Sequence, residues 1–416
     1  SVATNAVLAV TQPPFCGIGG DIFALIWSNK EEKVDFLNGS GRSGKNASIK
    51  TFTENGLTQI PSKGFYPMTI PGCVDGWHTL LEKYGTMELH DLLQDAIYYA
   101  EKGFPVSHIL SSLIQDDVSL KFSTTSISEY STTSEIFLPN NKIPMPGEIL
   151  IQKNLAETLK IIAKEGRDAF YSGCIAEEIS NYLEENNAIL NQNDFKNHSS
   201  NWGDPISTEY QGYTIYDTPP NTQGIIALSM LNILEGYNLK NYGPASADRI
   251  HLFTEAKKLA YEERDKYITD PSFTKIPVDK ILSKESAILK RNMINMDKVY
   301  NYQDSGLFSN QDTTYFAVID KDKNVASVIQ SLFHGFGSGV VLGKTGIIMQ
   351  NRGSWFSLNP RHVNKIEPNK RTMHTLTAAM IFNDNQPYAV LGSAGGSYQP
   401  QLHTILINNI IDYKMN

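Results

Sequence analysis

The chain has 416 residues, of which 41% are hydrophobic and 19% charged, the composition of a soluble globular protein with one large core or two to three domains. A formal net charge of -8 excludes the broad basic surface that a nucleic-acid-binding domain needs. Cysteine occurs only three times, too sparsely for a disulfide framework, and no apolar run is long enough to cross a membrane.

The first part of the chain predicts helices around one early hairpin. Residues 1–10 predict a buried helix, with no start methionine or signal peptide, so we expect a missing N-terminal part, favour a cytoplasmic location and leave export open. Residues 21–27 and 34–37 flank a polar stretch and predict the hairpin. The Ser/Thr-rich segment 116–135 predicts a loop. Apolar periodicity predicts further helices over residues 74–84, 90–102, 154–165, 174–184, 223–235 and 246–267.

From Thr313 onward the pattern changes to strands. Residues 313–319 and 325–332 are rich in β-branched and apolar side chains and predict a second hairpin. Further strands are predicted over residues 213–220, 346–350, 376–382 and 387–392, with a closing helix near 400–412. Helices followed by strands, with hairpins in both halves, predict the α+β class with mainly antiparallel sheets.

Thr313 is a candidate nucleophile because of where it lies. It starts a strand directly after the irregular polar run 304–312. An internal threonine hydroxyl is a weak nucleophile, whereas a threonine freed as a new N-terminus carries its own α-amine as a general base. Self-cleavage at this junction would create such a terminus. The position alone also fits an ordinary structural threonine at a strand start.

Two glycine-rich segments suggest different chemistries. Gly395 and Gly396 follow an apolar strand and could offer backbone N–H groups to an oxyanion, or could simply form a tight turn. Residues 39–46 nearly match a nucleotide phosphate loop. However, Asn46 replaces the Ser/Thr that holds Mg²⁺, and no convincing helix follows. Nucleotide binding through Gly39 to Asn46 therefore stays an alternative.

A series of short strings recurs along the chain in a fixed order. They are CGIGG (16–20), PGCVDG (71–76), GFPVS (103–107), DAFYSG (168–173), PPNTQG (219–224), TTYFAVIDKD (313–322) and GSAGG (392–396). Together these strings resemble the gamma-glutamyltranspeptidase family over nearly the whole chain. The family's N-terminal segment and C-terminal end are expected to be missing. The segment NRGSWF (351–356) resembles a divergent branch that includes enzymes acting on other small amides, such as oxamate.

The resemblance implies an N-terminal-nucleophile hydrolase with four layers in the order αββα. It implies one precursor that cleaves itself between Asp312 and Thr313. Residues 1–312 would be the large-subunit region and residues 313–416 the small-subunit region, both within one intertwined body. No cofactor and no metal would be needed. The implied catalytic residues are Thr313, Thr314, Ser331, Gly395 and Gly396.

The resemblance also implies where the substrate binds, and there this sequence departs from the family. The candidate substrate-binding residues are Arg42, Arg352, Trp355, His374 and Thr375. Trp355 replaces an acidic residue and removes the counter-charge for an ammonium group, while Arg352 adds repulsion. Arg42 and Arg352 could bind a carboxylate in bidentate fashion, or could form ordinary salt bridges.

The sequence therefore predicts an amide-cleaving enzyme that forms an acyl-enzyme on Thr313. Its substrate would be a gamma-glutamyl or similar small carboxylate-bearing amide, and the acceptor would be water or an amino compound. The large and small fragments would stay associated, and the oligomeric state is left open. The alternatives are a catalytically silent relative that binds a small carboxylate, and a nucleotide-binding protein.

Overall fold

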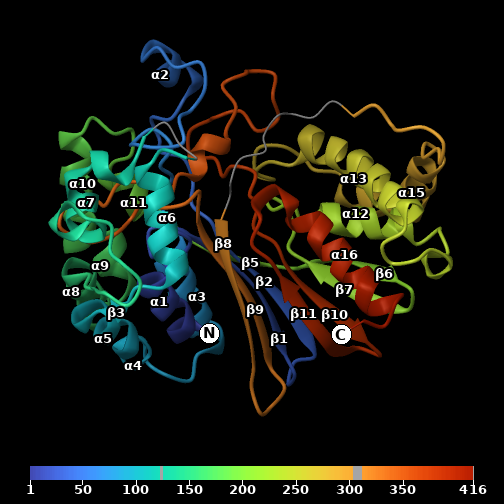
Figure 1. The fold of residues 1–416 in the computed structure, drawn as a ribbon, viewed down its shortest axis with the longest axis horizontal. Coiled ribbons are helices and arrows are strands. Elements are labelled where there is room, and N and C mark those ends of the chain that lie inside the picture. Colours follow the sequence, from blue (N-terminus) through green and yellow to red (C-terminus); the bar gives the residue numbers. More distant parts are fainter. Residues whose placement is uncertain (122–124, 303–311, 416) are drawn as a thin grey trace.

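Two antiparallel sheets form the centre of the molecule in the computed structural model, which describes residues 1–121, 125–302 and 312–415 (Figure 1). The five-stranded sheet consists, in spatial order, of β5 (Asn201–Gly203), β2 (Lys33–Gly39), β1 (Asp21–Ser28), β9 (Val325–Phe333) and β8 (Asp312–Ile319). The four-stranded sheet consists of β11 (Gln386–Gly392), β10 (Ala378–Asn383), β7 (Tyr213–Asp217) and β6 (Ile206–Tyr210). A short ribbon pairs β3 (Phe104–Pro105) with β4 (Ile149–Leu150). The predicted class, α+β with antiparallel sheets, is confirmed.

Residues before and after Thr313 share both sheets. β1 pairs with β9 from Asp21 opposite Ser331 to Trp27 opposite Val325. β7 pairs with β10 in the other sheet. Each sheet is therefore built from strands that are about 150 to 300 residues apart along the chain.

Helices lie on both sides of the paired sheets (Figure 1). One group contains α1 (Val2–Thr11), α3 (Cys73–Tyr84), α4 (Leu89–Leu92), α5 (Gln94–Lys102), α6 (His108–Val118), α7 (Ser131–Phe137), α8 (Lys153–Glu165), α9 (Arg167–Tyr171), α10 (Cys174–Glu185) and α11 (Gln192–Lys196). The other group contains α12 (Gly224–Leu234), α13 (Ala247–Tyr267), α14 (Val278–Leu282), α15 (Lys284–Arg291) and α16 (Gln399–Ile411). In the described residues no helix has the length and apolar character needed to span a membrane.

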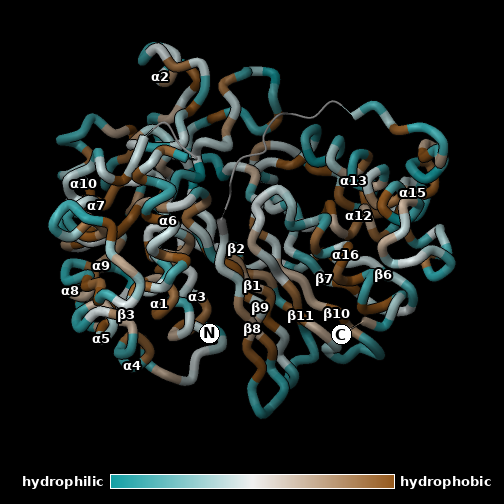
Figure 2. Tube along the Cα trace, viewed as in Figure 1, coloured by the Kyte–Doolittle hydropathy of each residue, from teal (hydrophilic) through white to brown (hydrophobic). Residues whose placement is uncertain are grey.

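The strands near the centre are apolar because both of their faces are covered (Figure 2). Successive side chains of a strand point to opposite faces. Phe23 and Leu25 of β1 pack with Met380 of β10. Ile22 and Ala24, on the other face of β1, pack into the large cluster that includes α1 and α3. All eight residues of β1 are accordingly buried.

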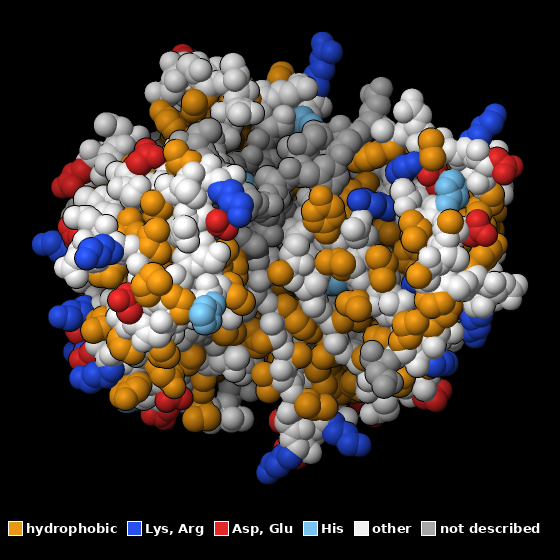
Figure 3. Space-filling model, viewed as in Figure 1, with side chains coloured by type: hydrophobic (Ala, Val, Ile, Leu, Met, Phe, Trp, Pro, Cys, Tyr) orange, Lys and Arg blue, Asp and Glu red, His pale blue; other side chains and the backbone are white. Residues whose placement is uncertain are grey.

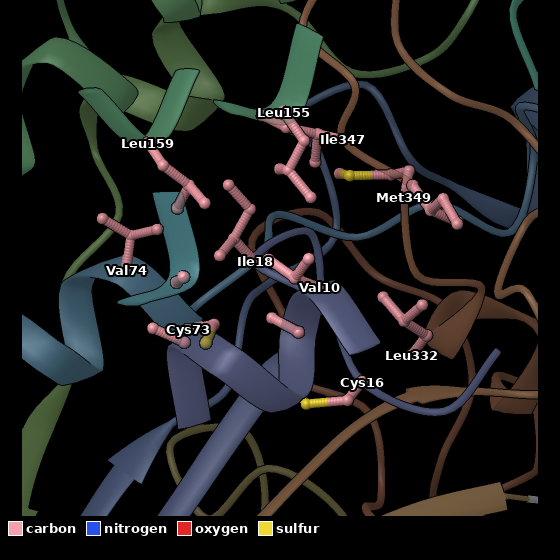
Figure 4. Packing of buried hydrophobic residues seen from close by; sticks show 14 of the residues in the cluster. Val10, Cys16, Ile18, Cys73, Val74, Leu155, Leu159, Leu332, Ile347 and Met349 are labelled. Carbon is pink, nitrogen blue, oxygen red and sulfur yellow. The ribbon is translucent and has the colours of Figure 1, made fainter. Parts of the chain in front are cut away.

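Two predicted segments differ from the structure. Residues 346–350 form no strand, only a single bridge of Ile348 with Val341. Their hydrophobicity reflects burial, since Ile347 and Met349 belong to the same core cluster as Leu332 (Figure 4). A run of apolar residues cannot by itself distinguish a strand from another buried segment.

The segment 116–135 is also more helical than predicted. It includes the end of α6, the 3-10 turn Ile127–Glu129 and most of α7, while residues 122–124 lie outside the described residues. Ser126, within this segment, and Ser107, before it, both cap helical turns. Ser107 accepts a hydrogen bond from the Leu110 N–H, and Ser126 forms a capping box with Glu129.

The charged side chains are mixed on the face shown in Figure 3. There the Lys and Arg side chains of the described residues are scattered among apolar and acidic ones rather than gathered in one patch. This distribution agrees with the net charge of -8.

Candidate active site

Thr313 lies in the edge strand β8, at an irregularity in the pairing of β8 with β9. The pairing of β8 with β9 shifts between Asp312, opposite Phe333, and Thr314, opposite Gln330. Between these two pairs β8 contributes one residue, Thr313, and β9 contributes two, so the extra residue of this bulge lies in β9 opposite Thr313. The Thr313 side chain is buried, and its Oγ1 accepts a hydrogen bond of 3.3 Å from Gln399 Nε2.

Gln399 is a site residue that sequence reasoning missed. It begins α16, three residues after Gly396, and is fully buried. Its Oε1 accepts a hydrogen bond of 2.9 Å from the backbone N–H of Thr377. A polar residue at the start of a helix usually faces solvent, so only its closeness to the glycine pair in sequence could have indicated its position.

Thr314 and Ser331 contact other partners. The Thr314 hydroxyl donates to Gln12 Oε1 over 3.3 Å, and the residue also hydrogen-bonds Cys16, so it faces the region of α1. Ser331 Oγ accepts a hydrogen bond of 2.6 Å from the Phe333 N–H. The Thr314 side chain therefore lies against the region of α1, and its catalytic role stays a prediction.

Gly395 and Gly396 connect β11 to α16 in a conformation that favours glycine. Their φ angles are 116° and 49°. The Gly396 carbonyl accepts a hydrogen bond of 2.8 Å from Gln223 Nε2, which also donates to the Thr375 carbonyl over 2.8 Å. Neither glycine N–H donates to any other described residue. Two N–H groups at a helix start are suited to binding a negative oxygen.

Arg352 is a buried cation with a free edge. Its Nη1 donates to Thr375 Oγ1 over 3.0 Å, and its guanidinium lies 3.9 Å from the centre of the Phe333 ring. Among the described residues Nε and Nη2 have no hydrogen-bond partner. Burial lowers the pKa of Arg352 to about 9, because a buried charge is poorly solvated. Phe333 in turn contacts Trp355 edge-to-face at 5.5 Å between ring centres.

His374 connects its own segment to Asp21 of β1, and none of its hydrogen bonds within the described residues goes to Thr313. Its Nδ1 accepts from the Leu376 N–H over 3.3 Å, so the proton is assigned to Nε2, which lies 3.1 Å from Asp21 Oδ2. Burial, followed by the charge of Arg352, lowers the pKa of His374 to about 3. The imidazole is therefore neutral at pH 7. Asp21 also accepts from the Gly41 N–H at 3.0 Å.

Arg42, unlike Arg352, is hydrogen-bonded to a carboxylate of the protein. Its Nη1 donates to Asp270 Oδ2 over 2.9 Å and to the Asn369 carbonyl over 3.2 Å. The Asp270 side chain is buried, whereas that of Arg42 is 34% exposed. Of the two arginines predicted to bind a carboxylate, Arg42 is thus already paired with one from the protein itself.

The geometry does not support the nucleotide-binding alternative. Three of the backbone N–H groups in the glycine-rich segment that would bind phosphate are used within the protein. Those of Gly41, Ser43 and Lys45 donate to Asp21, to the Lys370 carbonyl and to Asp194. The helix that follows, α2 (Ile49–Glu54), has six residues, and its own Ser48 caps it. No group of three His, Cys, Asp or Glu side chains in the described parts of the chain could hold a metal ion.

Comparison with solved structures defines the class of enzyme. The chain superposes on cephalosporin acylase from Bacillus halodurans with a TM-score of 0.92 and 36% identity, covering 100% of this chain and 76% of that one. Gamma-glutamyltranspeptidase from Helicobacter pylori gives a TM-score of 0.69 and 28% identity, covering 74% and 89%. Both folds belong to enzymes that act on acyl groups, and this chain shares their arrangement of helices and antiparallel sheets.

The family follows from the sequence comparison. The model for gamma-glutamyltranspeptidase matches residues 1–416, and the chain belongs to this family. It is 41% identical over 417 residues to the glutathione hydrolase-like YwrD proenzyme of Bacillus subtilis (strain 168), covering 100% of this chain and 77% of that protein. It is 33% identical over 421 residues to the oxamate amidohydrolase proenzyme of Klebsiella pneumoniae, covering 99% and 76%. The chain is therefore a gamma-glutamyltransferase-like enzyme of the N-terminal-nucleophile hydrolase type, and the resemblance to a divergent branch is confirmed.

Proposed function

We propose that this protein is a self-processing amidohydrolase or acyltransferase whose nucleophile is Thr313. Its substrate is a gamma-glutamyl or similar small carboxylate-bearing amide. The observation that carries the proposal is the buried Thr313 hydroxyl at a strand irregularity, held by Gln399, the residue that starts the helix after Gly395 and Gly396. Nucleophile and oxyanion donors thus come from two segments joined by one hydrogen bond.

The first reaction is cleavage of the chain at its own nucleophile. Thr313 Oγ1 attacks the carbonyl carbon of Asp312, the peptide C–N bond breaks, and the hydroxyl proton passes to the departing nitrogen. Water then hydrolyses the resulting ester. The products are a carboxylate on Asp312 and a free α-amine on Thr313, which serves as the general base in turnover. Proenzyme is the word used for the YwrD-like and oxamate-cleaving relatives, which supports processing here.

The second reaction is acyl transfer. The Thr313 α-amine takes the hydroxyl proton as Oγ1 attacks the substrate amide carbon, and the N–H groups of Gly395 and Gly396 stabilise the oxyanion. The leaving amine takes the proton and departs. Water or an amino compound then attacks the acyl-enzyme and regenerates the hydroxyl. Removing one such oxyanion donor typically slows turnover by about 100-fold to 1,000-fold.

Arg352 is the proposed carboxylate-binding residue. Nε and Nη2 lie on one edge of the guanidinium, which is the edge that binds a carboxylate with two parallel hydrogen bonds. These are the two nitrogens without a described partner, whereas Nη1 is held by Thr375. The side-chain amide of Gln223 donates to the carbonyls of both Thr375 and Gly396. It therefore connects the proposed carboxylate site to the proposed oxyanion loop.

The proposal extends to the division of the chain. Residues 1–312 and 313–416 would be the large and small fragments, and they would remain one body because strands of both form each sheet. We also propose the four-layer αββα arrangement. It is supported by an apolar cluster between the strands and by helix-lined clusters beyond them.

The first test is the intact mass of the purified protein under denaturing conditions, with N-terminal sequencing of any fragment. The proposal expects two pieces, the smaller beginning Thr313-Thr314-Tyr315. A screen of gamma-glutamyl, glutaryl and oxalyl amides comes next, and it measures the amine that each substrate releases. Cleavage without turnover of any acyl amide would indicate the silent relative. An uncut chain after long incubation would contradict Thr313 as a nucleophile.

A further inference from the structure

Gln399 is the described residue whose side chain holds the Thr313 hydroxyl. We propose that Gln399 is a catalytic residue that donates a hydrogen bond to Thr313 Oγ1 and stabilises the negative charge that develops there. This role rests on the proposed function, because it needs Thr313 to be the nucleophile. It adds a donor to the nucleophile itself, distinct from the oxyanion donors on the glycine pair.

The orientation of the Gln399 amide is fixed by its other end. Its Oε1 accepts from the backbone N–H of Thr377 over 2.9 Å, and a backbone N–H can only donate. A flipped amide would place two donors against each other. The NH₂ group therefore faces Thr313 Oγ1, at 3.3 Å. The hydroxyl accepts from Gln399, so its own proton stays available for transfer to a base.

A buried polar chain supports this orientation from behind. Thr377 Oγ1 lies 3.4 Å from His403 Nδ1, and that nitrogen lies 3.5 Å from Asp217 Oδ2. Gln399 and His403 are one helical turn apart on α16, so both side chains point to the same side. All four side chains are fully buried. Thr377, His403 and Asp217 are positioning residues, since they reach the nucleophile only through Gln399.

The chemical consequence concerns the charge on oxygen. As the hydroxyl proton leaves, Oγ1 gains negative charge, and a hydrogen bond to the charged form favours that form. Hydrogen bonds to charged groups are stronger than those between neutral groups. Gln399 therefore stabilises the transition state more than the resting threonine. A donor placed in advance within a buried site needs no rearrangement during the reaction.

The test compares three variants during timed cell-free synthesis, with the uncut and cut chains measured by mass. Gln399→Ala removes the donor, and we expect self-cleavage to slow by roughly 10-fold to 100-fold. Gln401→Ala is the matched control. It is the same residue type two positions further along α16, where it lines the outer groove beside Ile250 and Ile405, and its cleavage rate should equal that of the wild type. Melting temperatures of all variants report whether the fold is retained.

Gln399→Glu distinguishes donation from packing. A glutamic acid keeps the size of glutamine but donates only while protonated. We expect its cleavage rate, relative to the wild type, to rise as the pH is lowered. A ratio that does not change with pH, or a Gln399→Ala variant that cleaves as fast as the wild type, would overturn the role. If the wild type itself gave no fragment beginning at Thr313, the proposed function would fail and this role with it.

Discussion

Replacing Arg352 by methionine should separate substrate binding from stability. Methionine is shorter but unbranched and adaptable, so it can still pack on Phe333, while it removes the buried charge and its donors. In the protein without substrate, Arg352 is 1% exposed and has two nitrogens without a described partner. Such an arrangement is unfavourable for folding, because an unmet buried donor costs about 1–3 kcal/mol.

The magnitude follows from the free guanidinium edge. Two hydrogen bonds from Nε and Nη2 to a substrate carboxylate, at about 1.5 kcal/mol each, give about 3 kcal/mol. Their loss should lower kcat/KM by roughly 150-fold for an amide whose acyl group carries a carboxylate. Replacing a buried ion by an apolar side chain is often neutral or stabilising. We therefore expect an unchanged or higher melting temperature for Arg352→Met.

The assay measures kcat/KM for glutaryl anilide and for butyryl anilide, which lacks the carboxylate, together with melting curves. Arg361→Met is the control, since Arg361 is exposed and its loss changes the net charge equally. Arg352→Met should lose activity on the glutaryl substrate but not on the butyryl one. An equal loss on both substrates, or a melting temperature several degrees below that of the wild type, would refute the reasoning and indicate a structural arginine.

The remaining predictions concern the nucleophile, the substrate and the effect of acid. Thr313→Ala should remove both self-cleavage and turnover while leaving the melting temperature close to that of the wild type; turnover at the wild-type rate would contradict the mechanism. The enzyme should prefer a glutaryl over a gamma-glutamyl anilide, because the α-ammonium of the latter meets Trp355 and a like charge rather than a carboxylate; the ratio of the two kcat/KM values checks this. Burial lowers the pKa of His374 and His334 to about 3 and that of His198 to about 4. Since each unfolded histidine takes up a proton near pH 6.5 and the folded one does not, stability is fully present above 6.5 and falls below it. The slope is about 1.4 kcal/mol per pH unit for each histidine, down to about pH 4, which urea unfolding at several pH values measures.

Much of the fold was predictable because its local signals agree with its tertiary contacts. The hairpin of β1 and β2 and the helices α3, α5, α8 and α10 follow from sequence patterns that the packing uses directly, whereas the short helices α9, α11, α14 and α15 were not predicted. Residues 346–350 were not predictable as a buried loop. Ile347 and Met349 pack in the core without forming a strand, and only the folded structure shows this. The Ser/Thr-rich segment was misread because a serine at a helix N-cap and a serine in a loop have the same sequence signal.

The site was predictable only where a motif marks it. Thr313 and the glycine pair stand out, but the partner of the threonine hydroxyl does not. Gln399 contacts Thr313 across 86 residues of sequence, and no periodicity connects the two positions. Likewise, Arg42 and Arg352 looked alike as carboxylate binders. They differ because Asp270 lies beside Arg42 and not beside Arg352. Only the fold determines which arginine has this partner.

The pairing of β1 with β9 has a consequence for how the mature enzyme could be recovered after unfolding. While the chain is continuous, the two strands are covalently linked, so their pairing is a unimolecular event. Once the peptide bond before Thr313 is cut, the same pairing joins two molecules, and its yield depends on their concentration. We expect the precursor to refold independently of dilution, whereas the cut pair would persist through slow unfolding rather than through easy reassembly. Storage and heat treatment would then act on the mature enzyme as irreversible losses that the precursor does not suffer.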